Sequence, residues 1–242
     1  MTNPEVEIVL CIPGPWDSQT DLVKRVVKDS GGYIFAGRVL QKLESEEFFE
    51  LQLEYPDERM FSAFQAAGPH WKGTPEMELI ATHKSVAYLI SNGGSLEAAH
   101  SIMEAANGLL KAGGFGVKVE STGIAHSPQA WAEQCKYNYL FKSHSSYVVY
   151  ITDIEYTYSC GMHNFGLPDA ITRTSESENS ADLLRDFTHY LLSESPQIES
   201  GQTFSADADS PVYRIYQSPC IDYGEESLFN NPYGTWGLEI VK

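Results

Sequence analysis

Apolar residues change their spacing several times along the first ninety residues, and each change marks a new element. An apolar residue at every second position predicts a strand, whereas a repeat of three or four predicts a helix. The pattern predicts strands at 6–12, 33–40, 48–55 and 78–90, a helix from Asp17 or Ser18 to Gly31, and a helix that begins at Asp57. In chain order this is βαββαβ, the arrangement of a ferredoxin-like unit.

The strand at 48–55 shows the clearest alternation of apolar and polar residues in this unit. Phe49, Leu51, Leu53 and Tyr55 all point to one side of a strand. That side needs to be covered, so we expect an antiparallel sheet with both helices packed on the same face.

The rest of the chain also alternates between helical and extended patterns. It predicts helices at 95–113, 128–135 and 180–193, and strands at 115–120, 147–151, 155–160, 212–216 and 236–241. The fold class is therefore α+β with a mainly antiparallel sheet. A ferredoxin-like subdomain at 1–135 would pack on an acidic α+β subdomain at 136–242. Because no Ser/Gly linker separates them, one continuous domain fits the sequence equally well.

Charge restricts the partners that this chain can bind. It carries 33 acidic and 16 basic residues, a formal net charge of -17, and twelve of the acids lie within 174–241. Nucleic acids and anionic membranes attract clusters of Lys and Arg, and the sequence has no such cluster. The charge favours a basic protein partner and excludes nucleic acid and membrane surfaces.

The N-terminus and the cysteines indicate a reducing compartment. The first residues contain acids where a signal peptide has Lys or Arg, so we expect a cytoplasmic protein. The four cysteines are widely separated and include no CxxC pair, which predicts free thiols: Cys11, Cys135, Cys160 and Cys220.

Candidate chemistry is sparse. Cys160 and His163 are spaced like metal ligands, but a structural zinc site needs a second pair, so a buried thiol and a hydrogen-bonded imidazole are the simpler interpretation. His83 and His126 could act as bases only if a nucleophile and a carboxylate converged on them. The glycines at 113–116 follow a helix, the reverse of a dinucleotide loop. We predict no catalytic residue, metal or cofactor.

The segment 222–236 is the most distinctive surface candidate. Phe229, Tyr233 and Trp236 are residue types that dominate interface hot spots, and the acids Asp222, Glu225 and Glu226 precede or flank them. These six residues form the predicted partner-binding site. The competing interpretation is a loop folded back on the core of its own chain.

Several motifs from about residue 80 to the end resemble one known family. They are HKSVAYLISNGG, LEAAHSIMEAANGLLKAGG, GIAHSPQAW, CGMHNFGLPD and LLRDFTHYLL with the downstream SGQTFS. In order and spacing they are similar to the bacterial domain of unknown function 4261. The resemblance implies an α+β cytosolic bacterial protein without an established activity or functional residues. It weakens at 219–233, where this chain has a longer acidic and aromatic loop.

These observations favour a non-enzymatic, acidic protein-binding module. The most specific form of this hypothesis is an immunity or antitoxin-like protein that neutralises a basic toxin domain, by analogy with proteins that mimic an acidic substrate. One alternative is an enzyme that uses a His/Cys pocket built from His83, His126, Cys160 and His163. Another is a structural homodimer rather than a monomer, formed through an exposed sheet edge.

Overall fold

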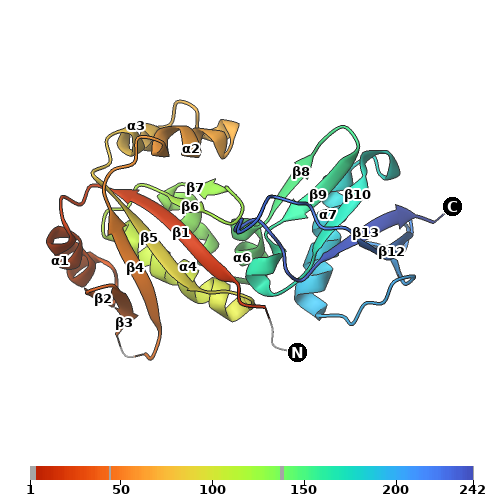
Figure 1. The fold of residues 1–242 in the computed structure, drawn as a ribbon, viewed down its shortest axis with the longest axis horizontal. Helices are drawn as coiled ribbons and strands as arrows, with labels where there is room; N and C mark the ends of the chain where they lie inside the picture. The colour runs from red at the N-terminus through yellow and green to blue at the C-terminus, as the bar shows by residue number, and fades with distance from the viewer. Residues whose placement is uncertain (1–3, 44, 137–138, 242) are drawn as a thin grey trace.

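The computed structural model describes residues 4–43, 45–136 and 139–241, and the fold is α+β, as predicted. It contains a seven-stranded sheet and a six-stranded sheet. Figure 1 shows the two sheets side by side along the long axis of the molecule, with the N-terminal residues and the loop before β13 meeting between them. Within the described ranges, no helix combines the length and apolar character needed to cross a bilayer.

The first sheet is antiparallel throughout and has the order β2-β3-β4-β5-β1-β6-β7. Its three longest strands lie next to one another in the middle of the sheet. The strands are β1 (Glu7–Gly14), β2 (Tyr33–Ala36), β3 (Val39–Lys42), β4 (Phe48–Glu54), β5 (Ser85–Asn92), β6 (Val117–Val119) and β7 (Ala125–His126). This is consistent with the predicted βαββαβ order but does not by itself confirm a ferredoxin-like unit.

The helices cover both faces of this sheet, so the prediction that they share one face was wrong. Helices α1 (Gln19–Asp29) and α4 (Leu96–Lys111) pack on the face that carries Leu10 and Leu89. Helices α2 (Met60–Ala66) and α3 (Pro75–Ala81) pack on the opposite face against Cys11 and Val86 (Figure 1). The physical reason is that β1 and β5 are apolar on both sides, so each side requires a cover.

Two segments that were predicted as single strands each contain parts of two elements. The segment 33–40 folds into the hairpin β2–β3, in which Gly37 adopts a φ of +62° in a two-residue loop. The segment 78–90 begins as α3, which has Pro75 at its first position and buries Met77 and Ile80 one turn apart. Only its second part is the strand β5.

The second sheet has the order β11-β12-β13-β10-β9-β8 and is antiparallel except where β10 and β13 run parallel. Its strands are β8 (Val149–Thr152), β9 (Tyr156–Cys160), β10 (Asp169–Arg173), β11 (Thr203–Phe204), β12 (Tyr213–Ser218) and β13 (Thr235–Ile240). Helix α7 (Ser180–Glu194), which was predicted, packs on β9 and β10. The strand β10 was not predicted.

Helix α6 (Tyr139–Tyr147) contacts α4 and α7, and α5 (Pro128–Gln134) contacts α4 and α6. Short 3-10 helices occur at Pro69–Trp71, Met162–Phe165 and Thr174–Glu176. One cluster of buried apolar residues includes members of both sheets. Two buried aromatic side chains bond α4 at its backbone: Tyr147 donates to the Ala99 carbonyl over 2.9 Å, and Trp131 donates to the Met103 carbonyl over 3.0 Å. The division at residues 135 and 136 stays a prediction.

Candidate functional site

The loop at 219–234, called the acidic loop below, has neither helix nor strand but is held by its own hydrogen bonds. The Asp222 carboxylate accepts the Gly224 N–H over 2.8 Å, and the Asn230 side chain donates to the Gly224 carbonyl over 2.7 Å. Gly224 and Glu226 adopt positive φ values of +91° and +59°. A chain of tight turns therefore fixes the path of the loop.

The three predicted acids lie on this loop and are exposed: Asp222, Glu225 and Glu226. Of the three, Asp222 uses one oxygen to close the turn at Gly224. The structure therefore places these acids within five consecutive residues of one exposed loop segment.

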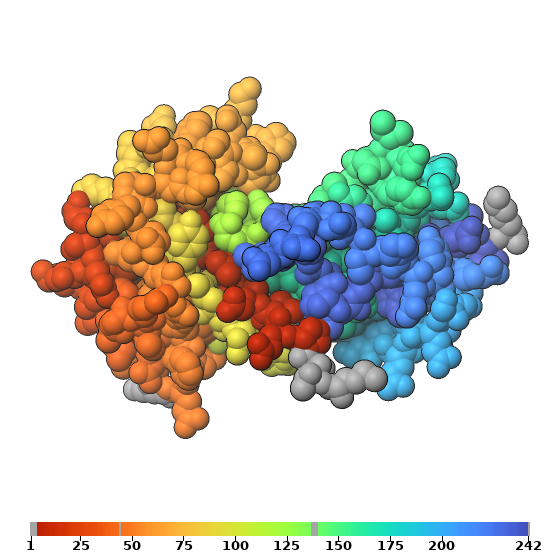
Figure 2. All heavy atoms as spheres, viewed as in Figure 1, coloured from red at the N-terminus to blue at the C-terminus, as the bar shows by residue number. Residues whose placement is uncertain are grey.

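The aromatic residues of the loop are half-buried against the first half of the chain. The Phe229 ring packs on the Tyr223 ring at a centroid distance of 5.4 Å and lies next to Gly123. The Tyr233 hydroxyl donates to the Pro4 carbonyl over 3.4 Å. Figure 2 shows the loop (blue) lying across the junction, beside the N-terminal residues (red). The loop is thus partly folded back on its own chain, and its aromatic side chains are only partly exposed.

Trp236 occupies a different environment from the other predicted residues. It is the second residue of β13 and pairs with Ala170 in β10 and Gln217 in β12. It is half-buried and packs against the main core, two positions from the buried Leu238 and therefore on the same side of the strand. Trp236 thus belongs to the sheet and not to the loop.

A buried carboxylate attaches the acidic loop to the second sheet. Asp169, at the start of β10, accepts hydrogen bonds from the Ser159 hydroxyl over 2.8 Å and from the Asn231 amide over 2.7 Å. Burial raises the pKa of Asp169 to about 6, against the opposing effect of these donors and of the Met162 and Gly161 N–H groups. The site joins loop and sheet, and the sequence analysis did not identify it.

Cys160 and His163 are both buried in the segment that leads from β9 to β10. Burial raises the pKa of the Cys160 thiol to about 12 and lowers the pKa of His163 to about 4, the latter against a weaker opposite effect of the Leu228 backbone. In the part of the chain that the structure describes, no three His, Cys, Asp or Glu residues are grouped as metal ligands would be.

The two other candidate histidines, His83 and His126, form hydrogen bonds with the backbone of neighbouring segments. In His83, Nδ1 donates to the Ile80 carbonyl at 2.7 Å and Nε2 accepts the Asp57 N–H at 3.0 Å, so this ring joins the segment before α2 to the end of α3. His126 bonds the Ser146 carbonyl at 3.0 Å, and burial lowers its pKa to about 4. Three cavities occur in the described part of the chain, and their walls do not include His83, His126 or Cys160.

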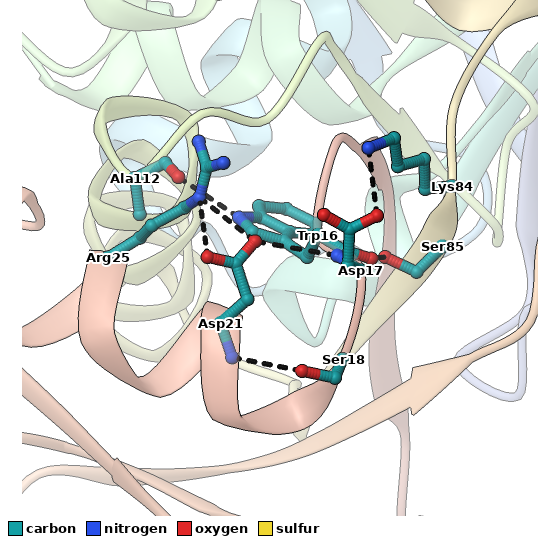
Figure 3. A network of polar contacts seen from close by, with 8 residues as sticks. All are labelled: Trp16, Asp17, Ser18, Asp21, Arg25, Lys84, Ser85 and Ala112. Carbon is teal, nitrogen blue, oxygen red and sulfur yellow. Dashed lines mark hydrogen bonds and ion pairs between the residues drawn. The ribbon is translucent and has the colours of Figure 1, made fainter.

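The largest of these cavities, about 600 Å³, is an open groove between the start of α1 and the strands β2 to β4. Figure 3 shows the polar contacts at one end of it. Trp16 donates to the Ala112 carbonyl over 3.0 Å, Ser85 donates to the Trp16 carbonyl over 2.9 Å, and Lys84 pairs with Asp17 at 2.8 Å. These polar groups bond one another, so they stabilise the groove and do not point to a ligand.

A second cavity, of about 440 Å³, lies between α6, β8 and α7 and contains His144 and His189. The sequence analysis missed this pair, because the two residues are 45 positions apart and meet only when α6 packs on α7. The only local signal was the helical spacing of Arg185 and His189, which places them on one face of α7.

Residues 158–230 match the model of the family described as domain of unknown function (DUF4261). No curated protein and no solved structure matches the chain. The matched stretch runs from β9 through α7 and β12 into the acidic loop, so it includes Asp169, the His144 partner His189, and Asp222. Residues 158–230 are thus similar to the DUF4261 family, the family that the motifs of the sequence resemble.

Proposed function

We propose that this chain is a non-enzymatic, acidic protein-binding module that binds a basic protein through the acidic loop. The observation that carries the proposal is the cluster of exposed acids, Asp222, Glu225 and Glu226, on a loop tied to the core through Asn231 and Asp169. A loop that is already ordered loses little conformational entropy on binding. Its charges can therefore recognise a partner at low entropic cost.

The net charge of the whole chain supports the same surface. With a formal charge of -17, the molecule attracts cationic partners over distances longer than any contact, which increases the rate of association. The fixed acids of the loop then set the orientation of the partner. Charge thus acts first on the rate and then on the specificity of binding.

Apolar contact area comes from the exposed parts of the same loop. Leu228 is 39% exposed at the loop surface, and Phe229 and Tyr233 are half-buried beside it. Side chains that are already held in place form good anchors because they need little further ordering. Trp236 would contribute through the exposed edge of its ring on β13.

The finer proposal is an immunity or antitoxin-like role in a bacterial cytoplasm, in which the partner is a basic toxin domain. The support for it is the analogy between an acidic protein surface and the acidic substrate of a nucleic-acid-cleaving toxin. On this proposal the acids occupy the basic active site of the toxin and block it. The chain itself needs no catalytic residue.

The test is an affinity purification in which three forms of the chain serve as baits. One is the natural chain, one has Asp222, Glu225 and Glu226 changed to Lys, and the control has the exposed acids Glu194, Glu199 and Asp209 changed to Lys. Both triple variants change the net charge equally. A basic protein that the natural and control baits retain, and the loop variant loses, supports the proposal. Equal retention by all three baits contradicts it.

The toxin role is tested separately with the captured protein. Its expression alone should stop growth, and co-expression of the natural chain or the control variant should restore growth. Co-expression of the loop variant should not. A captured partner that leaves growth unchanged contradicts the toxin role but leaves the binding proposal in place.

A further inference from the structure

The cavity between α6, β8 and α7 has a composition unlike that of the chain as a whole. It is lined by Phe141, Lys142, His144, Ser145, Val148, Tyr150, Arg185 and His189. Among the described residues of this wall there are two permanent cations, two imidazoles, two hydroxyls and no carboxylate, in a chain with about twice as many acids as bases. The wall is therefore suited to an anion, with apolar contact from Phe141 and Val148.

A chain of hydrogen bonds behind the cavity fixes the orientation of both imidazoles. The Thr188 hydroxyl donates to the Leu184 carbonyl over 2.8 Å, so its oxygen is an acceptor for the Tyr150 hydroxyl at 2.7 Å and for His144 Nε2 at 3.1 Å. With the Thr188 oxygen as acceptor, His144 donates from Nε2, which also lies 3.4 Å from the Tyr150 hydroxyl oxygen. Its Nδ1 is left as an acceptor, and His189 Nε2 lies 3.2 Å from it as the donor.

These assignments leave one ring nitrogen for a ligand. His144 is buried and burial lowers its pKa to about 3, so it stays neutral and keeps this pattern at neutral pH. His189 donates from Nε2, and none of the described residues bonds its Nδ1. That nitrogen accepts a hydrogen bond when the ring is neutral and donates one when the ring is protonated.

Two permanently charged residues line the same cavity as this imidazole. Arg185 is one helical turn from His189, and its guanidinium lies over the Tyr150 ring at 5.4 Å from the ring centroid. Asp182 accepts a bond from one Nη1 of Arg185, and a guanidinium has further N–H groups to donate. Lys142, on α6, is the second cationic residue of the wall.

We propose that this cavity binds a small organic anion, a carboxylate or a phosphate monoester with an apolar body. Arg185 and Lys142 hold the charged group, His189 Nδ1 bonds it or a neighbouring hydroxyl, and the apolar body contacts Phe141 and Val148. Arg forms paired hydrogen bonds with either kind of oxyanion, which is why the two classes share one site. None of these residues belongs to the acidic loop.

The experiment follows the histidine ring nitrogens by NMR during titration with three probes: benzoate, phenyl phosphate and the neutral benzyl alcohol. At least one of the two anions should shift the His189 and His144 signals in a saturable way, and benzyl alcohol should not. The tighter anion identifies the class of charged group. Arg185→Gln should weaken its binding by about tenfold or more, as the loss of a charge-assisted hydrogen bond predicts. Lys142→Gln should weaken it several-fold.

The matched control is Arg214→Gln, which removes the same charge from an exposed position on β12 and should leave the affinity unchanged. The free variants should keep the His144 signals of the natural chain, which shows that the cavity is intact. The absence of saturable shifts with both anions would overturn the proposal. So would equal binding of benzyl alcohol, or affinity that does not respond to Arg185→Gln.

Protonation supplies a second readout. In the free protein burial lowers the pKa of His189, with Asp186 opposing and Arg185 reinforcing this shift. From α6, His144 contacts the ring and Lys142 lines the same cavity. A bound anion stabilises the protonated ring and should raise the His189 pKa. The affinity should therefore increase as the pH falls through the pKa of the complex. An unchanged His189 pKa at saturation would contradict a contact with the charged group.

Discussion

The side-chain amide of Asn231 donates a hydrogen bond of 2.7 Å to the buried carboxylate of Asp169 and a second bond of 3.0 Å to the Leu167 carbonyl. The side-chain oxygen Oδ1 of Asn231 in turn accepts the Tyr233 N–H over 2.9 Å. One side chain therefore joins the acidic loop to the start of β10. The position of the loop depends on the second sheet and not only on its own turns.

Asn231→Ala should release the acidic loop. It leaves a buried carboxylate oxygen and the Leu167 carbonyl without their donor, which should lower the free energy of unfolding by about 1–3 kcal/mol. Hydrogen exchange should increase across 219–234 and remain unchanged in β1 and β5. The control is Asn230→Ala, which removes hydrogen bonds within the loop only. It should lower the free energy of unfolding by less than Asn231→Ala does. An equal loss of stability in both variants would show that the bond from Asn231 to Asp169 does not specifically hold the loop.

The buried ionisable groups should make stability depend on pH between about 4 and 6.5. Burial lowers the folded-state pKa values of His126, His144 and His163 to about 4, 3 and 4, whereas unfolded imidazoles titrate near 6.5. Near pH 5 these three therefore gain protons on unfolding. Asp169, with a raised folded pKa of about 6, loses one. The balance is an uptake of about two protons, so stability should fall by roughly 3 kcal/mol per pH unit of acidification.

Asp169→Asn isolates the contribution of the carboxylate. The natural Asp169 contributes stability that is fully present below the unfolded pKa of about 4 and is lost as the pH rises through about 6. Without it, the uptake near pH 5 should increase to about three protons, and the decline in stability towards acid should become steeper. Urea unfolding at pH 7, 6 and 5 measures both slopes. A slope no steeper than that of the natural chain would show that Asp169 is ionised in the folded state at pH 5.

The four cysteines should differ sharply in reactivity. Cys220 is exposed, whereas Cys11 and Cys160 are buried and Cys135 is partly buried. Burial raises the pKa values of the last three, to about 12 for Cys135 and Cys160. A thiol-specific disulfide reagent should therefore modify one thiol rapidly in the folded protein, and Cys220→Ser should abolish that phase. Unfolding without a reductant should expose four thiols, and a smaller number would reveal a disulfide.

Local sequence signals predicted those elements whose ends are marked by capping or turn residues in the sequence. Ser18 and Ser95 accept the N–H groups of Asp21 and Ala98 at the starts of α1 and α4, as helix-capping serines do. The strand β10 gave no such signal, because four of its five residues are buried and apolar and polar residues do not alternate in it. Its parallel pairing with β13 joins segments more than sixty residues apart. Such pairing depends on the whole fold.

The same limit applies to the sites. The exposed acids of the loop could be chosen from composition and turn residues, because exposure follows from charge. The bond from Asn231 to Asp169 and the contact of His144 with His189 join residues 62 and 45 positions apart. No period or spacing within one segment contains that information. Trp236, chosen for the partner-binding site, lies in the strand that was predicted at 236–241, but its packing on the core was not predicted.

Gly161, in the segment between β9 and β10, should tolerate no side chain. Its φ is +124°, and a Cβ at this position would lie 2.2 Å from the Tyr147 carbonyl oxygen and 2.8 Å from Thr122 Cγ2. Tyr147 cannot move away easily, because its hydroxyl bonds the Ala99 carbonyl in α4. Gly161→Ala therefore combines backbone strain with a steric clash in a packed core.

Gly201→Ala separates the two effects. Gly201 has a φ of +100° but no heavy atom within 4 Å of the added Cβ, so its substitution should cost only the strain, about 1–2 kcal/mol. Gly161→Ala should cost at least about 3 kcal/mol more, or prevent folding altogether. Urea unfolding of both variants measures the difference. If the two variants lose the same stability, the backbone at Gly161 does not approach Tyr147 this closely in solution, and the packing of α6 on this segment is looser than the structure shows.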